Sequence, residues 1–180
     1  MASQDEEFTM LFQEFYPSLC RFLECLLGGR VELAQDLAQE SFLQLHRTAW
    51  ETLPHEQARF WLYRVARNFA INEFRKSHTR YRLFDRVVEV MTPRSRNPEE
   101  EYETAERKQL VLTMLRTLPE DQRVALLLRE QEQLSYRDIS QVLNVSESKV
   151  KVDIFRARAS LRERWNKVSG LSRYAGVGNS

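Results

Sequence analysis

Cations and exposed apolar side chains share one face of the segment 149–162, KVKVDIFRARASLR. At 100° per residue, Val150 and Ile154 fall on a stripe that can be buried, whereas Val152 and Phe155 lie opposite, between flanking cations. Lys and Arg reach phosphates and guanine edges, and apolar groups contact thymine methyls, so this face predicts binding in a DNA major groove. The candidate side chains from the pattern are Lys149, Lys151, Val152, Phe155 and Arg156. The alternative is a helical hairpin whose cations only keep it soluble.

The residues before this segment predict a helix-turn-helix. Ser135-Tyr-Arg-Asp138 has the form of a capping box, Asn144 tolerates the left-handed turn conformation, and Ser146 can cap the following helix. A short helix, a tight turn and a longer basic helix have the order of this DNA-binding motif. Asp153 lies beside the buried stripe, so we expect it to pair with Lys149 or Arg156 rather than to face DNA.

A second candidate face lies on the segment 57–77. Its inward stripe is Leu62, Val65, Ala66 and Phe69, and its opposite side carries Trp61, Arg64, Asn68, Ile71, Asn72 and Arg75. An aromatic ring, two carboxamides and guanidinium groups together provide stacking, base-edge hydrogen bonds and phosphate contacts. The alternative reading places Trp61 in the core.

The segment 31–50 has the opposite charge. With Ala38, Phe42, Leu45 and Ala49 inward, its outer face shows Glu32, Asp36, Gln39, Glu40 and Leu43. An acidic face with an exposed leucine is more typical of a protein-docking surface than of a nucleic-acid site. A merely solvated acidic face is the alternative.

The charge distribution agrees with two contacts to a polyanion. Residues 59–86 carry eight basic and two acidic side chains, and residues 147–180 carry eight and three, whereas residues 1–58 carry three and ten. The overall net charge of +1 conceals this segregation.

The sequence offers little support for an enzyme. His46, His55 and His78 lack metal-ligand spacing, and we find no glycine-rich phosphate loop and no nucleophile–base pair, so we expect no catalytic residue, no metal and no cofactor. Cys20 and Cys25 are expected to be reduced core thiols, with a redox sensor as the alternative. The acidic N-terminus lacks the order of a signal peptide and no apolar run is long enough to span a membrane, so we expect a cytoplasmic protein without membrane insertion.

Periodicity and breakers predict an all-α protein. Five glycines and five prolines in 180 residues favour helices, expected at about 6–25, 31–50, 57–77, 104–118, 120–131, 135–143 and 146–165. We expect two small helical domains, residues 1–79 and 105–166, joined by a linker at 80–104 and followed by a flexible tail at 167–180.

Four stretches together resemble a known family. DLAQESFLQLHR (36–47), WLYRVARNFAINEFR (61–75), TLPEDQRVALLLREQEQLSYRDIS (117–140) and VKVDIFRARASLR (150–162) are similar in order and spacing to the extracytoplasmic-function (ECF, group IV) sigma factors, which are sigma-70 family subunits of bacterial RNA polymerase. The resemblance implies that sigma domain two docks on the polymerase β′ clamp and binds the −10 promoter element. It implies that sigma domain four holds the β flap and reads the −35 element.

The resemblance also implies roles for individual residues. It implies that Asp36, Gln39, Glu40 and Leu43 bind the polymerase. It implies binding to the −10 element by Trp61, Arg64, Arg67, Asn68, Asn72, Arg75 and Lys76. It implies binding to the −35 element by Tyr136, Arg137, Lys149, Lys151, Val152, Phe155 and Arg156. Implied partners are core RNA polymerase, promoter DNA and an anti-sigma factor. Lys149 and Asp153 depart from the usual threonine and arginine of the recognition helix, Asn72 stands where aspartate is frequent, and the loop 52–60 lacks a common glycine. The alternative function is a free-standing helix-turn-helix regulator that binds duplex DNA without polymerase.

Overall fold

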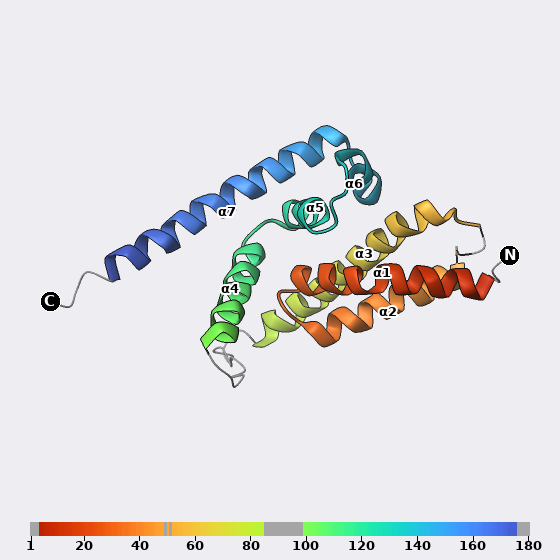
Figure 1. Ribbon diagram of the computed structural model, residues 1–180, viewed down its shortest axis with the longest axis horizontal. Coiled ribbons are helices and arrows are strands. Elements are labelled where there is room, and N and C mark those ends of the chain that lie inside the picture. The colour runs from red at the N-terminus through yellow and green to blue at the C-terminus, as the bar shows by residue number, and fades with distance from the viewer. Residues whose placement is uncertain (1–3, 49, 51, 85–98, 176–180) are drawn as a thin grey trace.

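The computed structural model describes residues 4–48, 50, 52–84 and 99–175. Within these ranges all regular secondary structure is helical, as the sequence predicts, and there is no strand (Figure 1). The helices are α1 (Gln4–Leu26), α2 (Val31–Thr48), α3 (His55–Phe84), α4 (Glu99–Arg116), α5 (Glu120–Glu130), α6 (Tyr136–Leu143) and α7 (Glu147–Ala175).

Local sequence explains most helix ends. Gly28 and Gly29 separate α1 from α2. Their φ values are 72° and 91°, a conformation that residues with a side chain rarely adopt. A Cβ atom on Gly28 would also lie 2.7 Å from Cδ of Arg116. Pro119 precedes α5 as its N-cap residue, where its missing N–H is harmless.

Three helices are longer than the sequence pattern predicts. α3 continues past Ser77 to Phe84 because no glycine or proline interrupts it, and α4 begins at Glu99, where the acidic residues 99–101 favour a helix N-terminus. α7 continues through Gly170 to Ala175, beyond the end expected near residue 165. An ion pair between Lys167 and Glu163, 2.7 Å apart and one turn distant, supports this extension.

The first bundle consists of α1, α2 and α3, which pack on one another. Its core includes the fully buried side chains of Leu19, Phe22, Ala38, Leu45 and Leu62. The rings of Phe8 and Phe12 on α1 each pack edge to face on the ring of Phe42 on α2. These contacts hold α2 so that its acidic side faces outward.

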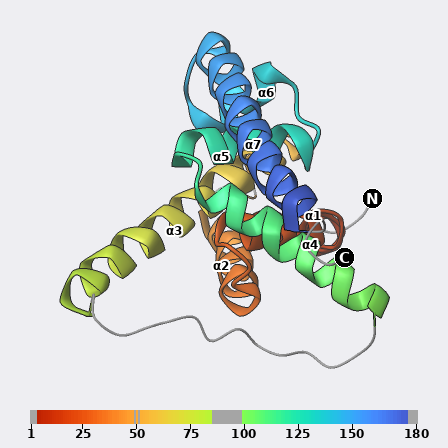
Figure 2. The ribbon, with the colours of Figure 1, turned by 90° about the vertical axis from the view of Figure 1, so that its left-hand side faces the viewer.

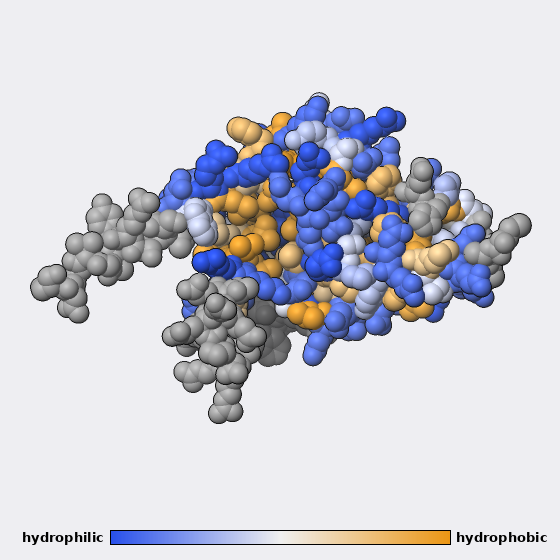
Figure 3. Space-filling model, viewed as in Figure 1, coloured by the Kyte–Doolittle hydropathy of each residue, from blue (hydrophilic) through white to orange (hydrophobic). Residues whose placement is uncertain are grey.

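The second bundle is formed by α5, α6 and α7, which pack on one another, with α4 leading into it. Val124, Leu128, Ile139, Val150 and Ile154 are among its most deeply buried apolar side chains. Apolar side chains also gather on the visible face between α4 and α7 (Figure 3). Val111 on α4 and Trp165 on α7 are each about half exposed.

The two bundles pack directly against each other. α1 contacts α4 and α5, and α3 contacts α6, so the buried side chains of both bundles form one continuous core. Figure 2 shows α7 and α6 above the first bundle, with the end of α3 extending away on the opposite side from α4. This packing brings two predicted DNA-binding elements, α3 and the α6–α7 pair, next to each other.

Candidate nucleic-acid and polymerase interfaces

The geometry of α6, the turn and α7 is that of a helix-turn-helix. Ser135 Oγ accepts a hydrogen bond from the backbone N–H of Asp138 at 3.1 Å, and the Asp138 carboxylate accepts one from the Ser135 N–H at 3.3 Å. Asn144 ends α6 in the left-handed conformation (φ 53°, ψ 50°), and Ser146 Oγ accepts from the N–H of Lys149 at 3.2 Å. The predicted capping box, turn residue and cap are all confirmed.

The outer face of α7 is open to solvent. Ile154 is 1 % exposed, whereas its neighbour Phe155 is 74 % exposed and Val152 is 44 % exposed. The side chains of Lys151, Val152 and Phe155 border a shallow groove of about 520 Å³ that also reaches Tyr136 of α6. An exposed phenylalanine beside cations is suited to contact base edges and methyl groups in a major groove.

The cations on this face differ in their partners. Lys151 lies 5.7 Å from the centre of the Tyr136 ring, which fixes its position without neutralising its charge. Lys149 instead donates to Asp153 at 2.5 Å and to Asp121 at 3.0 Å, and these carboxylates raise the pKa of Lys149. The expected pairing of Asp153 with Lys149 is therefore confirmed.

The remaining α6–α7 candidates, Arg137 and Arg156, are exposed, and Tyr136 is half-buried. The structure thus gathers Tyr136, Lys151, Val152 and Phe155 on one surface. Lys149 lies at the junction of α7 with α5, where its charge is balanced internally.

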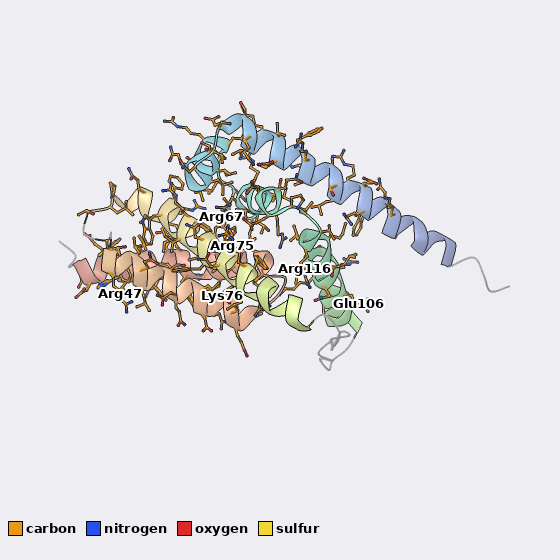
Figure 4. All side chains as sticks on the ribbon, turned by 180° about the vertical axis from the view of Figure 1, so that it is seen from behind. Arg47, Arg67, Arg75, Lys76, Glu106 and Arg116 are labelled. Carbon is orange, nitrogen blue, oxygen red and sulfur yellow. The ribbon has the colours of Figure 1, made fainter. Side chains whose placement is uncertain are left out.

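The α3 candidates divide into two groups. Asn68, Asn72, Arg75 and Lys76 are exposed, and Arg67, Arg75 and Lys76 succeed one another along the helix (Figure 4). Lys76 pairs with Glu73 at 2.7 Å. Trp61 is half-buried and packs against the core, so part of its ring has the core position that the sequence analysis gave as the alternative to base stacking.

Arg64 and Arg67 point to the second bundle. Arg64 donates through Nε to the carbonyl of Val142 at 3.2 Å, and through its terminal nitrogen to the carbonyl of Gln141, both at the end of α6. Arg67 approaches the carboxylates of Glu120 at 3.4 Å and Asp121 at 3.3 Å on α5. Two predicted −10 residues are thus in contact with the other bundle.

Sequence reasoning missed a buried polar cluster between the bundles. Glu132, in the segment between α5 and α6, inserts a carboxylate that is 3 % exposed, and Tyr63 of α3 donates a short hydrogen bond to it. Arg59 lies 3.7 Å from the same carboxylate and donates to the Glu132 carbonyl at 2.9 Å. Burial and the neighbouring carboxylate raise the pKa of Tyr63. The sequence feature that could have indicated this cluster is Tyr63. It adjoins Leu62 of the inward stripe, and a buried hydroxyl requires a hydrogen-bond partner.

The acidic face of α2 is accessible. Asp36, Gln39 and Glu40 are exposed, and Leu43 is 48 % exposed. Leu43 and Gln39 also line a groove of about 400 Å³ whose floor is formed by Phe8, Phe12 and Phe42. An apolar groove on a helix that also exposes acidic side chains suits a basic helical partner.

The described residues contain neither a metal-binding cluster nor a membrane-spanning helix. No group of three or more His, Cys, Asp or Glu side chains in this part of the chain is arranged to hold a metal ion. None of the helices in the same residues is both long and apolar enough to cross a membrane.

Comparison with known proteins agrees with the geometry. The sigma-70 region 2 family matches residues 11–80, and the sigma-70 region 4 family matches residues 108–161. The ECF sigma factor SigM of Bacillus subtilis is 29% identical over 160 residues, which cover 87% of this chain and 94% of that protein. The ECF sigma-E factor of Haemophilus influenzae is 33% identical over 150 residues, covering 76% and 75%.

Solved structures have the same fold. A complex of the sigma factor RpoE with the anti-sigma factor NepR from Bartonella quintana matches with a TM-score of 0.68 at 22% identity, covering 87% of this chain and 95% of that chain. CnrH in complex with the cytosolic domain of CnrY matches with a TM-score of 0.67 at 19% identity, covering 89% and 88%. The chain belongs to the ECF group of the sigma-70 family and is an RNA polymerase sigma factor.

Proposed function

We propose that this sigma factor acts as a promoter-specificity subunit without catalytic activity of its own, with one bundle for each promoter element. Residues 1–79 form the unit that docks on the β′ clamp and binds the −10 element, and residues 105–166 form the unit that reads the −35 element. The observation that carries this proposal is the separation of an acidic docking face on α2 from an exposed, cation-flanked apolar face on α7. Its place of action is the cytoplasm, where polymerase transcribes.

In this proposal the first bundle binds both protein and DNA. Asp36, Gln39, Glu40 and Leu43 contact the clamp, since acidic groups around a leucine complement a basic helical surface. Trp61, Asn68 and Asn72 take unstacked bases by stacking and carboxamide hydrogen bonds. Phosphate contacts along α3 come from Arg64, Arg67, Arg75 and Lys76.

The second bundle anchors the upstream duplex. Phe155 and Val152 contact base methyl groups, while Arg156, Lys151, Arg137 and Tyr136 reach phosphates and base edges. Lys149 joins them only if its contacts with Asp121 and Asp153 rearrange. The apolar face between α4 and α7 is the proposed contact for the β flap (Figure 3). An anti-sigma factor is a further proposed partner, supported by the match to the sigma factor RpoE, whose structure is a complex with the anti-sigma factor NepR.

Run-off transcription tests the proposal. Purified core polymerase is incubated with and without this chain on a genomic promoter library, and the transcript starts are sequenced. Starts that require the chain and share two spaced motifs support the proposal and identify the promoter. Tight duplex binding by the chain alone, without chain-dependent starts, would instead support the free-standing regulator, a reading that the open α7 face permits.

A further inference from the structure

Lys149 lies in the first turn of α7, but its side chain is bound within the second bundle. Its ammonium group lies 2.5 Å from Oδ2 of Asp153, one turn later on α7, and 3.0 Å from Oδ2 of Asp121 on α5. Its backbone N–H donates to Oγ of Ser146, which caps the same helix. Lys149 therefore joins the start of α7 to α5 through its side chain and to the helix cap through its backbone.

Asp153 is the most buried member of this ion-paired group. Its side chain is 10 % exposed, compared with 53 % for Asp121 and 43 % for Lys149. Asp153 directly precedes Ile154 of the buried stripe, so the helix period places its carboxylate beside the core. A carboxylate in such a position needs a charged partner, because its desolvation is otherwise not compensated.

Lys149 lies apart from the groove that Lys151 borders. At about 100° per residue, the two lysines are about 160° apart around α7. Lys151 borders the groove together with Val152 and Phe155, and its ammonium group lies 5.7 Å from the centre of the Tyr136 ring. One lysine thus faces the open groove, and the other faces two carboxylates.

A contact between Lys149 and DNA would require an unfavourable exchange. A phosphate can replace the carboxylates as partners of the ammonium group, but it cannot replace the ammonium group as the partner of Asp153. Loss of one hydrogen bond between charged groups changes an equilibrium constant by roughly tenfold to a hundredfold. The exchange would also leave two carboxylates beside the phosphates of the duplex, where like charges repel each other.

We infer that Asp153 is a positioning residue of the −35 reader: together with Asp121 it holds Lys149 as a strap between α5 and α7 and keeps this lysine from contacting DNA. The inference rests on the proposed −35 role of α7. Lys149 and Asp153 both depart from the residues that are usual in the family, and in this chain the two departures pair with each other. Reading of the −35 element on α7 then belongs to Lys151, Val152, Phe155 and Arg156.

Amine labelling of the full chain tests the strap without DNA. Lys149 and Lys151 are both exposed, so their rates of reaction depend on the fraction of neutral amine. The bonds to Asp153 and then to Asp121 raise the pKa of Lys149, which lowers that fraction. With limiting acetic anhydride and tandem mass spectrometry, we expect Lys149 to react several-fold more slowly than Lys151, and Asp153→Asn to reduce the difference. Equal rates in the wild-type chain would overturn the inference.

The salt dependence of promoter binding tests whether Lys149 contacts DNA. Holoenzyme is titrated with a fluorescent duplex of an identified promoter, at a temperature that keeps the duplex closed. The variant Lys149→Met/Asp153→Asn removes the strap without changing the net charge or leaving an unpaired carboxylate at position 153. We expect this double variant to keep the wild-type slope of log K against log salt concentration, whereas Lys151→Met should make the slope shallower by about 0.9, the contribution of one phosphate contact.

The single variant Lys149→Met distinguishes a strap from a DNA contact in a second way. It leaves the Asp153 charge without its lysine, so it should bind the promoter more weakly than wild type, and addition of Asp153→Asn should restore the affinity. If Lys149 contacts DNA, removal of the carboxylate cannot restore what removal of the amine has lost. The inference is therefore wrong if the double variant binds as weakly as Lys149→Met, or if its slope falls as far as that of Lys151→Met.

Glu163→Gln/Lys167→Met is the matched control. It removes an ion pair of 2.7 Å with the same spacing on the same helix, exposed on both sides, so the salt slope and the labelling rate of Lys149 should stay at wild-type values. Thermal unfolding verifies that each variant is folded. Holoenzyme that binds no promoter would refute the proposed function, whereas the labelling rates decide on the strap independently of DNA.

Discussion

Adjacent residues on α7 give the sharpest test of the proposed −35 face. Phe155 is 74 % exposed and Ile154 is 1 % exposed, so the two side chains point to solvent and to the core, respectively. Phe155→Ala should therefore remove a DNA contact without harming the fold. Ile154→Val should harm the fold slightly without removing a DNA contact.

The magnitudes follow from this difference in burial. Phe155→Ala removes little buried area, and alanine has the better helix propensity, so the free energy of unfolding should change by less than about 0.5 kcal/mol. Burial of a phenylalanine side chain on DNA is worth about 1.5–3 kcal/mol, which predicts an activity roughly tenfold to a hundredfold lower at limiting sigma factor. Ile154→Val should lower the free energy of unfolding by about 0.5–1.5 kcal/mol. Each kcal/mol should lower the Tm by about 2–4 °C.

Thermal unfolding and run-off transcription on an identified promoter measure the two effects separately. We expect Phe155→Ala to keep the wild-type Tm and to lose initiation, and Ile154→Val to do the reverse at a temperature well below its Tm. Binding to core polymerase should be unchanged in both. If Phe155→Ala lowers the Tm by several degrees, or initiates as well as wild type, then α7 does not present this ring to DNA.

Three further predictions concern other surfaces. Glu40→Lys should weaken binding to core polymerase at least tenfold in a fluorescence titration, because it reverses a charge on the exposed α2 face. Glu106→Lys on α4 is the control, and an equal loss of binding in this variant would argue against a specific docking surface. Arg156→Ala should lower promoter-dependent initiation by about 1–3 kcal/mol, or roughly fivefold to a hundredfold, with polymerase binding intact, and loss of both would assign Arg156 to the fold. Burial raises the pKa of the Cys20 and Cys25 thiols, so above about pH 8.5 the folded chain holds more protons than the unfolded chain. The urea midpoint should therefore be retained below about pH 8 and fall towards pH 9.5, and less so after Cys→Ser substitution at both positions; equal falls would assign the effect to other groups.

Local patterns in the sequence were sufficient for the helix-turn-helix. The capping box at Ser135, the left-handed turn at Asn144 and the buried stripe through Ile154 all depend on interactions within a few residues. The same holds for Asp153, whose pairing with Lys149 is a contact between residues four apart. Such features can be predicted because the helix period alone determines which side chains are neighbours.

The inter-bundle contacts could not be predicted in this way. Arg64 and Gln141 are 77 residues apart in sequence, and Tyr63 and Glu132 are 69 apart. Nothing in either segment specifies the other, since Arg64 donates to backbone carbonyls that any residue provides. The length of α7 was underestimated for a different reason: Gly170 is a weak break in a helix that continues on both sides of it.

The contacts between the two bundles bear on the proposed −10 face. Arg64 and Arg67 are held by carbonyls and by two carboxylates, so the phosphate contacts proposed for these guanidinium groups would have to replace bonds within the chain. Asn68 and Asn72 on the same helix are exposed, so the proposed base contacts would need no such replacement.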